Sequence, residues 1–570
     1  MSKETPNAAP DAVKTAGRGF LVITAAKVWF LVTSAVTQLG LPIFFGSAEQ
    51  FGVFKVVTEA IGLLNMVMIT GTLQAVSKLV SEQPDRANRM VTQAIKLQFF
   101  LGVPIAAGYA IASPWIADSF NDPTLTHLLQ ISSLIIVFYA FYAIFVGYLN
   151  GTKAFVKQAT LDITFSTLKT AGILGLVALG FGVWGAVSGF VGAAGIIAVV
   201  AGIWVFRLMK AQPDVAGNHE SRTGRLLGYL VLIMLYTFAL NGLMRADLFV
   251  LKSVAGEVPT AMAGAEGIFK VISDKFSGFY GAVLNVARIP YQGVIAITFV
   301  IFPMISESTF QDDIEKTRQY IRTTFRYCAL LIAGVAFMLV FNSDAIIAGL
   351  YSADYRAAAD ALSYLSVSII FFAVYYVATT IIIGAGHPAV AVVVMTISLV
   401  VSAVTNYVLV SQVHDTVMPL LQYAPFVLQP ATDASAIVHN ALGVATADVA
   451  LAGPFLLHGP EYMKAAAIAT TIGMVTGCLS SIAWIGWKYK AWPPLATIVR
   501  LLVGAAVLYG IAYVFPIPAW AVEKGRIAVL GMVVVRMAVM GVALLAVLGV
   551  SREFTSEDLA RVKRVVGRKK

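Results

Sequence analysis

The sequence predicts an all-α integral membrane protein with about fourteen transmembrane helices. Of its 570 residues, 59% are hydrophobic and 12% are charged, whereas soluble domains usually carry about a quarter charged residues. The mean hydropathy is +0.82, and apolar stretches recur from about residue 19 to about residue 550 without a long polar interval. A water-soluble fold could not bury so much apolar surface, so we expect one polytopic membrane domain.

Each predicted helix is placed by its length. A helix needs about 20 mainly apolar residues to cross the bilayer, where its backbone polar groups must be satisfied internally. The segments that meet this length are 19–45, 50–77, 90–117, 126–149, 155–180, 183–206, 226–251, 283–306, 325–342, 359–384, 388–411, 464–487, 496–516 and 527–549.

The distribution of basic residues predicts the orientation. If the amino terminus is cytoplasmic, most Lys and Arg residues, such as Arg86 and Lys488, fall in cytoplasmic loops, as the positive-inside rule requires. We therefore expect a multi-pass protein of the cell inner (cytoplasmic) membrane with both termini inside, as a lead at 1–18 and a basic tail at 551–570. The tail is expected to lie against anionic membrane lipids. The net charge of +10 is spread over short loops, so we expect no nucleic-acid partner.

Two segments expected on the outer side are unusual. Residues 260–282 place Glu266, Lys270 and Asp274 on one helical stripe and apolar residues opposite, a pattern typical of an interfacial amphipathic helix. Residues 412–460 form a long predicted loop without Lys or Arg.

Metal and redox chemistry are not expected. The predicted outer loop contains His414, His439 and His458, but their wide spacing does not favour a metal site. The two cysteines, Cys328 and Cys478, lie in apolar runs and are interpreted as packing residues. The sequence therefore predicts no cofactor.

An internal repeat is visible. Residues 131–154, ISSLIIVFYAFYAIFVGYLNGTKA, are similar to residues 366–389, SVSIIFFAVYYVATTIIIGAGHPA. Such repeats commonly build transporters whose two halves move about a central site.

Several segments in order resemble the polysaccharide-biosynthesis branch (oligosaccharide flippases) of the multidrug/oligosaccharidyl-lipid/polysaccharide exporter superfamily. They are RGFLVITAAKVWFLVTSAVTQLGLPIFFGSAEQFGVFKVVTEAIGLL, TLQAVSKLVSEQPDRANRMVTQAIK, IRTTFRYCALLIAGVAFMLVFNSDAIIAGLYSADYRAAADALSYLSVSIIFF and GAGHPAVAVVVMTISLVVSAVTNYVLV. The resemblance covers nearly the whole chain. It implies alternating access and a polyprenyl-pyrophosphate-linked saccharide as cargo.

The resemblance also implies the domain organisation. Two pseudo-symmetric six-helix bundles face a central cavity, and two additional helices follow. In this sequence these parts are the bundle at 19–210, a cytoplasmic linker at 211–225, the bundle at 226–490 and the additional helices at 491–550.

Charged residues inside the predicted helices are the candidate site. Lys27, Lys55, Arg245 and Arg288 lie on the first, second, seventh and eighth spans, which line the cavity in the resembled family. A Lys or Arg at the centre of a span costs about 2.5–3.5 kcal/mol on insertion scales. Structural explanations remain open, because Lys55 can pair with Glu59 at i,i+4 and side chains near an interface can extend to water.

We interpret these cations as the groups that hold the pyrophosphate of the cargo. Glu59, Asp162 or Asp247 would then change protonation or bind a coupling cation, a proton or sodium. Carboxylates beside cations can equally serve as counter-ions, and the sequence does not separate the two roles.

Other functions stay open at this stage. A lipid II (peptidoglycan precursor) flippase would use the same cations, and a cation-coupled drug antiporter would favour a cavity of carboxylates and aromatic residues. A membrane glycosyltransferase or polymer ligase would need a catalytic acidic motif or a basic outer loop. The sequence contains no Asp-x-Asp or His-Glu-x-x-His pattern, so we expect a transporter and no enzyme.

Overall fold

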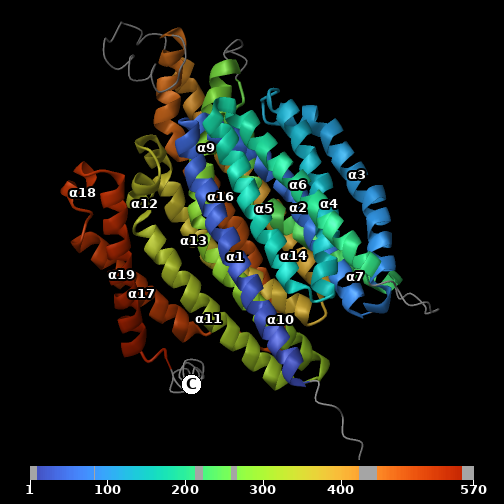
Figure 1. Ribbon diagram of the computed structural model, residues 1–570. Helices are drawn as coiled ribbons and strands as arrows, with labels where there is room; N and C mark the ends of the chain where they lie inside the picture. The colour runs from blue at the N-terminus through green and yellow to red at the C-terminus, as the bar shows by residue number, and fades with distance from the viewer. Residues whose placement is uncertain (1–8, 83, 212–222, 259–265, 423–445, 555–570) are drawn as a thin grey trace, which may run out of the picture. The chain divides into compact units, whose positions relative to one another are not determined.

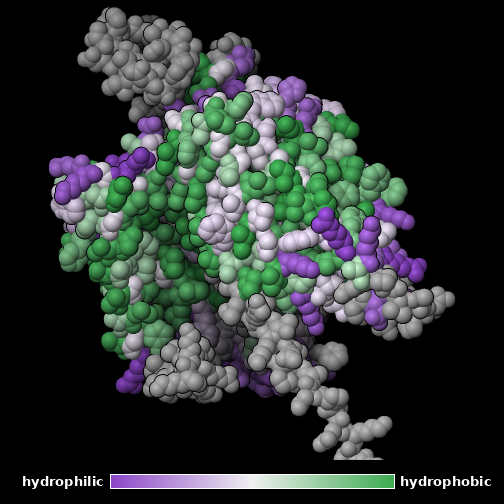
Figure 2. Space-filling view, in the orientation of Figure 1, coloured by the Kyte–Doolittle hydropathy of each residue, from purple (hydrophilic) through white to green (hydrophobic). Residues whose placement is uncertain are grey.

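The computed structural model describes residues 9–82, 84–211, 223–258, 266–422 and 446–554, and these residues form an all-helical protein without strands (Figure 1). Large hydrophobic side chains are exposed on its surface, including Trp115, Leu495 and Ile527. Figure 2 shows such hydrophobic side chains over much of the visible face. An apolar exterior of this kind is expected where lipid is the solvent, so the prediction of a polytopic helical membrane protein is confirmed.

Eleven helices in the described part of the chain are long and apolar enough to cross a membrane, or up to twelve if α7 and α8 form one broken span. The number is below the fourteen predicted. One reason is that 155–211 counts as a single stretch of 57 residues, about 85 Å of helix against a hydrocarbon core of about 30 Å. Gly180, at φ 89°, interrupts this stretch and separates α5 from α6, as the sequence predicts.

The chain divides into two compact units. The first comprises Met1–Arg245 together with Ser273–Gly278. Its helices are α1 (Ala9–Phe45), α2 (Ala48–Glu82), α3 (Ala87–Ser119), α4 (Leu125–Gly151), α5 (Phe155–Leu176), α6 (Gly182–Ala211) and α7 (Thr223–Leu243).

The second unit comprises Ala246–Ile272 and Phe279–Lys570. Its helices are α8 (Ala246–Ala255), α9 (Glu266–Ala287, except Ser273–Gly278, which belong to the first unit), α10 (Ile289–Phe310), α11 (Ile314–Val340), α12 (Ser343–Leu350), α13 (Ala359–Gly384), α14 (Pro388–Gln422), α16 (Thr446–Tyr489), α17 (Leu495–Val514), α18 (Ala519–Glu523) and α19 (Arg526–Val550).

The same helix pairings recur in the two units. In the first unit, α4 packs on α2, α3 and α6, and α5 packs on α1 and α6. In the second unit, α13 packs on α10, α11 and α16, and α14 packs on α8 and α16. The similar sequence segments 131–154 and 366–389 fall largely in α4 and α13, so the sequence repeat coincides with equivalent places in the packing.

The two unusual segments differ from their predictions. Helix α9 extends to Ala287, and Asp274 on its expected polar stripe is fully buried, although Glu266 is exposed. Helix α14 continues to Gln422 and α16 begins at Thr446, so both ends of the predicted loop at 412–460 are helical. Residues 423–445, which contain His439, lie outside the described residues, as do 1–8 of the lead and most of the linker and the tail. The rest of the predicted lead, 9–18, is helical and forms the start of α1.

The last two spans are fixed to α11 within the second unit. Buried residues of α17 and α19, among them Leu508 and Met540, pack against Phe337 and its neighbours on α11. After α19, the Glu553 carboxylate accepts hydrogen bonds from Arg326 Nε of α11 (2.7 Å) and Thr497 Oγ1 of α17 (2.7 Å).

Glu553 also bonds Arg500 of α17, and its side chain is 1% exposed. Burial acts to raise the pKa of Glu553, but the hydrogen bonds from Arg326, Arg500 and Thr497 outweigh it and hold the pKa below its usual range. The ionised carboxylate therefore joins three helices at one end of the C-terminal pair.

Candidate functional site

The first unit contains a buried charged cluster centred on Glu59 of α2. Glu59 Oε1 accepts a hydrogen bond from Lys55 Nζ at 3.3 Å, and Glu59 Oε2 lies 2.8 Å from Arg245 Nε. The side chains of Lys55, Glu59 and Arg245 are 3%, 11% and 13% exposed. Burying charges is costly unless they are paired, and here one carboxylate faces two cations.

Arg245 reaches this cluster from the end of α7. Its Nη1 atom donates to the side-chain oxygen of Asn241 at 2.7 Å and to the Asn241 carbonyl at 3.1 Å. Its Nη2 atom lies close above Gly62 of α2, where an added Cβ would be 2.9 Å away. The missing side chain at Gly62 therefore makes room for the guanidinium group one turn from Glu59.

A second ion pair in the first unit joins α1 to α5. Lys27 Nζ donates to Asp162 Oδ2 at 3.1 Å, and the Tyr142 hydroxyl of α4 donates to Asp162 Oδ1 at 3.2 Å. The carboxylate is largely buried at 12% exposure, whereas Lys27 is 62% exposed. Asp162 is thus held by two donors while its cation remains accessible.

The second unit contains a third charged site at the start of α8. Asp247 is 1% exposed, and its carboxylate accepts from the Tyr280 hydroxyl of α9 and from the backbone N–H of Leu248, each at 2.8 Å. Arg288, which lies between α9 and α10, interacts electrostatically with Asp247. This carboxylate is the most enclosed of the three.

The structure sorts the predicted site residues into local groups. Lys55, Glu59 and Arg245 meet in one cluster, Lys27 lies with Asp162, and Arg288 lies near Asp247. Each predicted cation is therefore beside a predicted carboxylate.

Sequence reasoning missed the polar side chains that complete these groups, namely Asn241, Tyr142 and Tyr280. Tyr and Asn occur throughout apolar helices, so nothing in their spacing distinguishes them. It also gave no role to Lys169 of α5, whose Nζ lies 5.0 Å from the ring centroid of Phe30 and 5.5 Å from that of Phe190, within cation–π range.

The His and Cys residues considered in the sequence analysis do not gather into one group in the described part of the chain. No group of three or more His, Cys, Asp or Glu side chains there is placed to hold an ion. His414 instead accepts or donates a hydrogen bond with the Tyr462 hydroxyl at 3.1 Å, and Cys328 and Cys478 are buried free cysteines.

Comparison with models of known protein families gives two matches along the chain. The family model described as polysaccharide biosynthesis protein matches residues 17–309, and a model described as lipid II flippase MurJ matches residues 293–432. No curated protein sequence matches the chain.

Solved structures of low sequence identity share the fold. The chain is similar to a lipid II flippase MurJ in an inward closed conformation, with a TM-score of 0.62, 12% identity, and coverage of 93% of this chain and 98% of that one. It is also similar to an outward-facing multidrug resistance MATE family transporter, with a TM-score of 0.50, 14% identity, and coverage of 86% of this chain and 99% of that one. A MOP superfamily transporter from Pyrococcus furiosus has a TM-score of 0.50 and 12% identity to this chain, with coverage of 83% of this chain and 95% of that one.

Proposed function

The chain belongs to the polysaccharide biosynthesis protein family, and we propose that it is a flippase that moves a polyprenyl-pyrophosphate-linked oligosaccharide across the cytoplasmic membrane for surface polysaccharide assembly. The multidrug/oligosaccharidyl-lipid/polysaccharide exporter superfamily, which includes this family, consists of transporters and not of enzymes. The proposed cargo crosses without a bond being made or broken, so the protein's task is to bind, enclose and release it.

The buried cluster of Lys55, Glu59 and Arg245 is the observation that carries this proposal. Charged side chains within spans are costly to insert and are rarely kept without a function. A pyrophosphate leaving water needs charge-assisted hydrogen bonds, which Lys and Arg supply. The cluster places one ammonium and one guanidinium group on the same carboxylate, within hydrogen-bonding reach of a common anion.

We infer that the pyrophosphate and Glu59 compete for the same cations. When Glu59 takes up a proton, its attraction for Lys55 and Arg245 falls and both become available to the cargo. When Glu59 loses the proton, the ion pairs reform and the cargo is released. Exchange of this kind couples transport to a proton gradient.

The other two charged sites fit the same scheme as additional contacts. Lys27 is accessible and can meet the cargo while Asp162 remains held by Tyr142. We propose Arg288, beside its counter-ion Asp247, as a separate cargo-binding residue of the second unit. The proposal keeps both termini in the cytoplasm and assumes alternating access between the repeated bundles.

Lipid II is the second candidate cargo. It is favoured by the lipid II flippase model that matches residues 293–432. Lipid II is also a polyprenyl-linked pyrophosphate, so the same cations would serve, and the saccharide alone would differ.

Reconstitution in vesicles tests the proposal. Purified protein is incorporated with a fluorescent polyprenyl-pyrophosphate oligosaccharide or with fluorescent lipid II, and an impermeant quencher reports the leaflet of the label. We expect quenching of inner-leaflet cargo with no change in its mass. Cargo of altered mass would instead indicate an enzyme, and lipid II alone being moved would identify the second candidate.

Matched variants assign the site. Lys55→Met and Arg245→Gln should each abolish flipping, whereas Arg207→Gln, on an exposed position of α6, should leave it unchanged. Full activity in Lys27→Met, Lys55→Met, Arg245→Gln and Arg288→Gln, all expressed normally, would contradict the assignment.

A further inference from the structure

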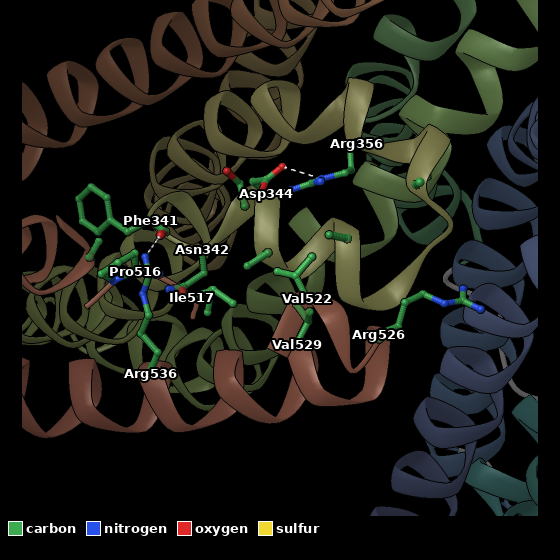
Figure 3. Close-up of a pocket in the computed structure, with 16 residues that line it drawn as sticks. Phe341, Asn342, Asp344, Arg356, Pro516, Ile517, Val522, Arg526, Val529 and Arg536 are labelled. Atoms are coloured by element: carbon green, nitrogen blue, oxygen red, sulfur yellow. Dashed lines mark hydrogen bonds and ion pairs between the residues drawn. The ribbon is translucent and has the colours of Figure 1, made fainter. Parts of the chain in front are cut away.

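A separate cavity lies in the second unit, between the turn from α11 to α12 and the C-terminal helices (Figure 3). Its volume is about 530 Å³, and its polar lining includes Asn342, Asp344, Arg356, Arg526 and Arg536. None of these residues belongs to the charged sites described above. Three arginines and one aspartate give the lining an excess of positive charge.

Arg536 is the innermost of these cations. It lies ten residues into α19, and its Nη2 atom donates to the Phe341 carbonyl at 2.7 Å, which Figure 3 shows as a dashed line. A guanidinium group has five N–H donors, so this bond leaves donors for a ligand. Among the described residues, Arg536 has no carboxylate partner, and its Nε atom is buried without a hydrogen bond.

Asn342 supplies a second buried polar atom without a partner. The residue is 2% exposed, and its amide nitrogen donates to the Met338 carbonyl at 2.7 Å. This bond fixes the orientation of the amide, and within the described residues its Oδ1 atom has no hydrogen-bond donor. Buried polar atoms are normally satisfied by protein, water or ligand, so the cavity offers a cationic donor and a neutral acceptor together.

The mouth of the cavity is charged. Arg356 Nη2 lies 2.8 Å from Asp344 Oδ2, and both side chains are more than half exposed. Arg526 extends away from the other labelled side chains (Figure 3). The exposed Arg526 therefore adds positive charge to the cavity lining beside the Arg356–Asp344 ion pair.

The remaining walls are apolar. Ala512, Pro516, Ile517, Val522 and Val529 line the cavity from α17, α18, α19 and the turns between them. A small hydrophilic anion would gain nothing from these walls. An amphiphile would gain by burying its apolar part against them while its charged part meets the arginines.

We propose that this cavity binds the phosphate-bearing headgroup of a membrane lipid. The phosphate accepts hydrogen bonds from Arg536, a hydroxyl or ammonium group of the headgroup donates to Asn342 Oδ1, and the glycerol and upper acyl chain lie against the apolar wall. The site is distinct from the proposed cargo site and does not depend on the identity of the cargo.

Native mass spectrometry of the full-length, detergent-purified protein tests this proposal. The probes are phosphatidylglycerol, phosphatidylethanolamine and inorganic phosphate. We expect one phospholipid to be retained at detergent concentrations that remove bulk lipid, and inorganic phosphate neither to be retained nor to displace it. Retention of inorganic phosphate without lipid would overturn the assignment to a lipid headgroup.

Three variants place the retained lipid. Arg536→Gln should weaken retention about tenfold or more, as expected for loss of one charge-assisted hydrogen bond. Ala348→Phe keeps every charge but fills the cavity, which Ala348 lines, so it should weaken lipid retention as strongly. This variant tests the site even if Arg536→Gln does not fold. Lys524→Gln is the control, because Lys524 is an exposed cation near the cavity that contacts Trp520. Equal retention by Ala348→Phe and the wild type would refute the site.

Discussion

Replacing Glu59 by Gln separates the electrostatic role of the buried cluster from its shape. The substitution keeps the size of the side chain and removes the carboxylate charge that lies 3.3 Å from Lys55 Nζ and 2.8 Å from Arg245 Nε. Removing one partner of a buried ion pair costs about 3–5 kcal/mol. Because the amide oxygen can still accept one hydrogen bond, worth about 1 kcal/mol, we expect a loss of about 2–4 kcal/mol in the free energy of unfolding.

Titration with SDS in mixed micelles measures that free energy. Glu315→Gln is the matched control, because Glu315 is 81% exposed and pairs with Arg318 at i,i+3. An exposed pair contributes about 0–1 kcal/mol. Equal losses in the two variants would refute the claim that the Glu59 cluster is a buried ion-pair network.

The same variant tests coupling. Gln cannot take up a proton, so Glu59→Gln vesicles should flip cargo at a rate that no longer responds to an imposed pH gradient. A rate that still rises with the gradient, as in the wild type, would remove Glu59 as the coupling group.

Three further changes have defined outcomes. Asp162→Asn should lower the flipping rate while changing the unfolding free energy by less than about 1 kcal/mol, because its partner Lys27 is largely exposed; a large loss of stability would show a structural role instead. Gly62→Ala places a methyl group 2.9 Å from Arg245 Nη2, so it should displace the flexible guanidinium group and reduce the flipping rate. A Gly62→Ala variant with the wild-type flipping rate would contradict that geometry. The pKa of Glu553 is lowered in the folded state. Its contribution to the free energy of unfolding is therefore complete above the usual carboxyl pKa of 4.5 and is lost as pH falls through the lowered value. Thermal unfolding of Glu553→Gln should therefore depend less on pH below about 4.5 than that of the wild type, and parallel curves would count against the argument.

Much of the helical organisation could be predicted from the sequence, because it depends on apolar length and local composition. The predicted spans 126–149 and 359–384 correspond to α4 and α13. The similar segments 131–154 and 366–389 fall largely in these two helices, so the repeat can be seen in the sequence alone. The ends of the predicted outer loop could not be placed from the sequence, because α14 and α16 continue through polar residues that a hydropathy pattern assigns to a loop. The buried state of Asp274 was also missed, because periodicity does not reveal which stripe meets another helix.

The candidate site could be predicted only in part. Lys55 and Glu59 are four residues apart on one helix, so their pairing follows from helix geometry. The addition of Arg245 to the same carboxylate depends on how α7 packs on α2 and on the absence of a side chain at Gly62. The cavity beside Arg536 was not predicted, because it is formed by helices far apart in the chain.

The two links between α11 and the C-terminal helices have a consequence for measuring transport. Arg326 lies on α11 and Phe341 directly follows its last residue, fifteen residues or about 22 Å of helix further along. They bond Glu553 and Arg536 respectively. Two links at separate levels oppose independent tilting of the helices, so we expect α19 to follow α11 during the transport cycle. A fluorophore at Val542, which is 69% exposed, would therefore report the motion of α11 through a label on α19.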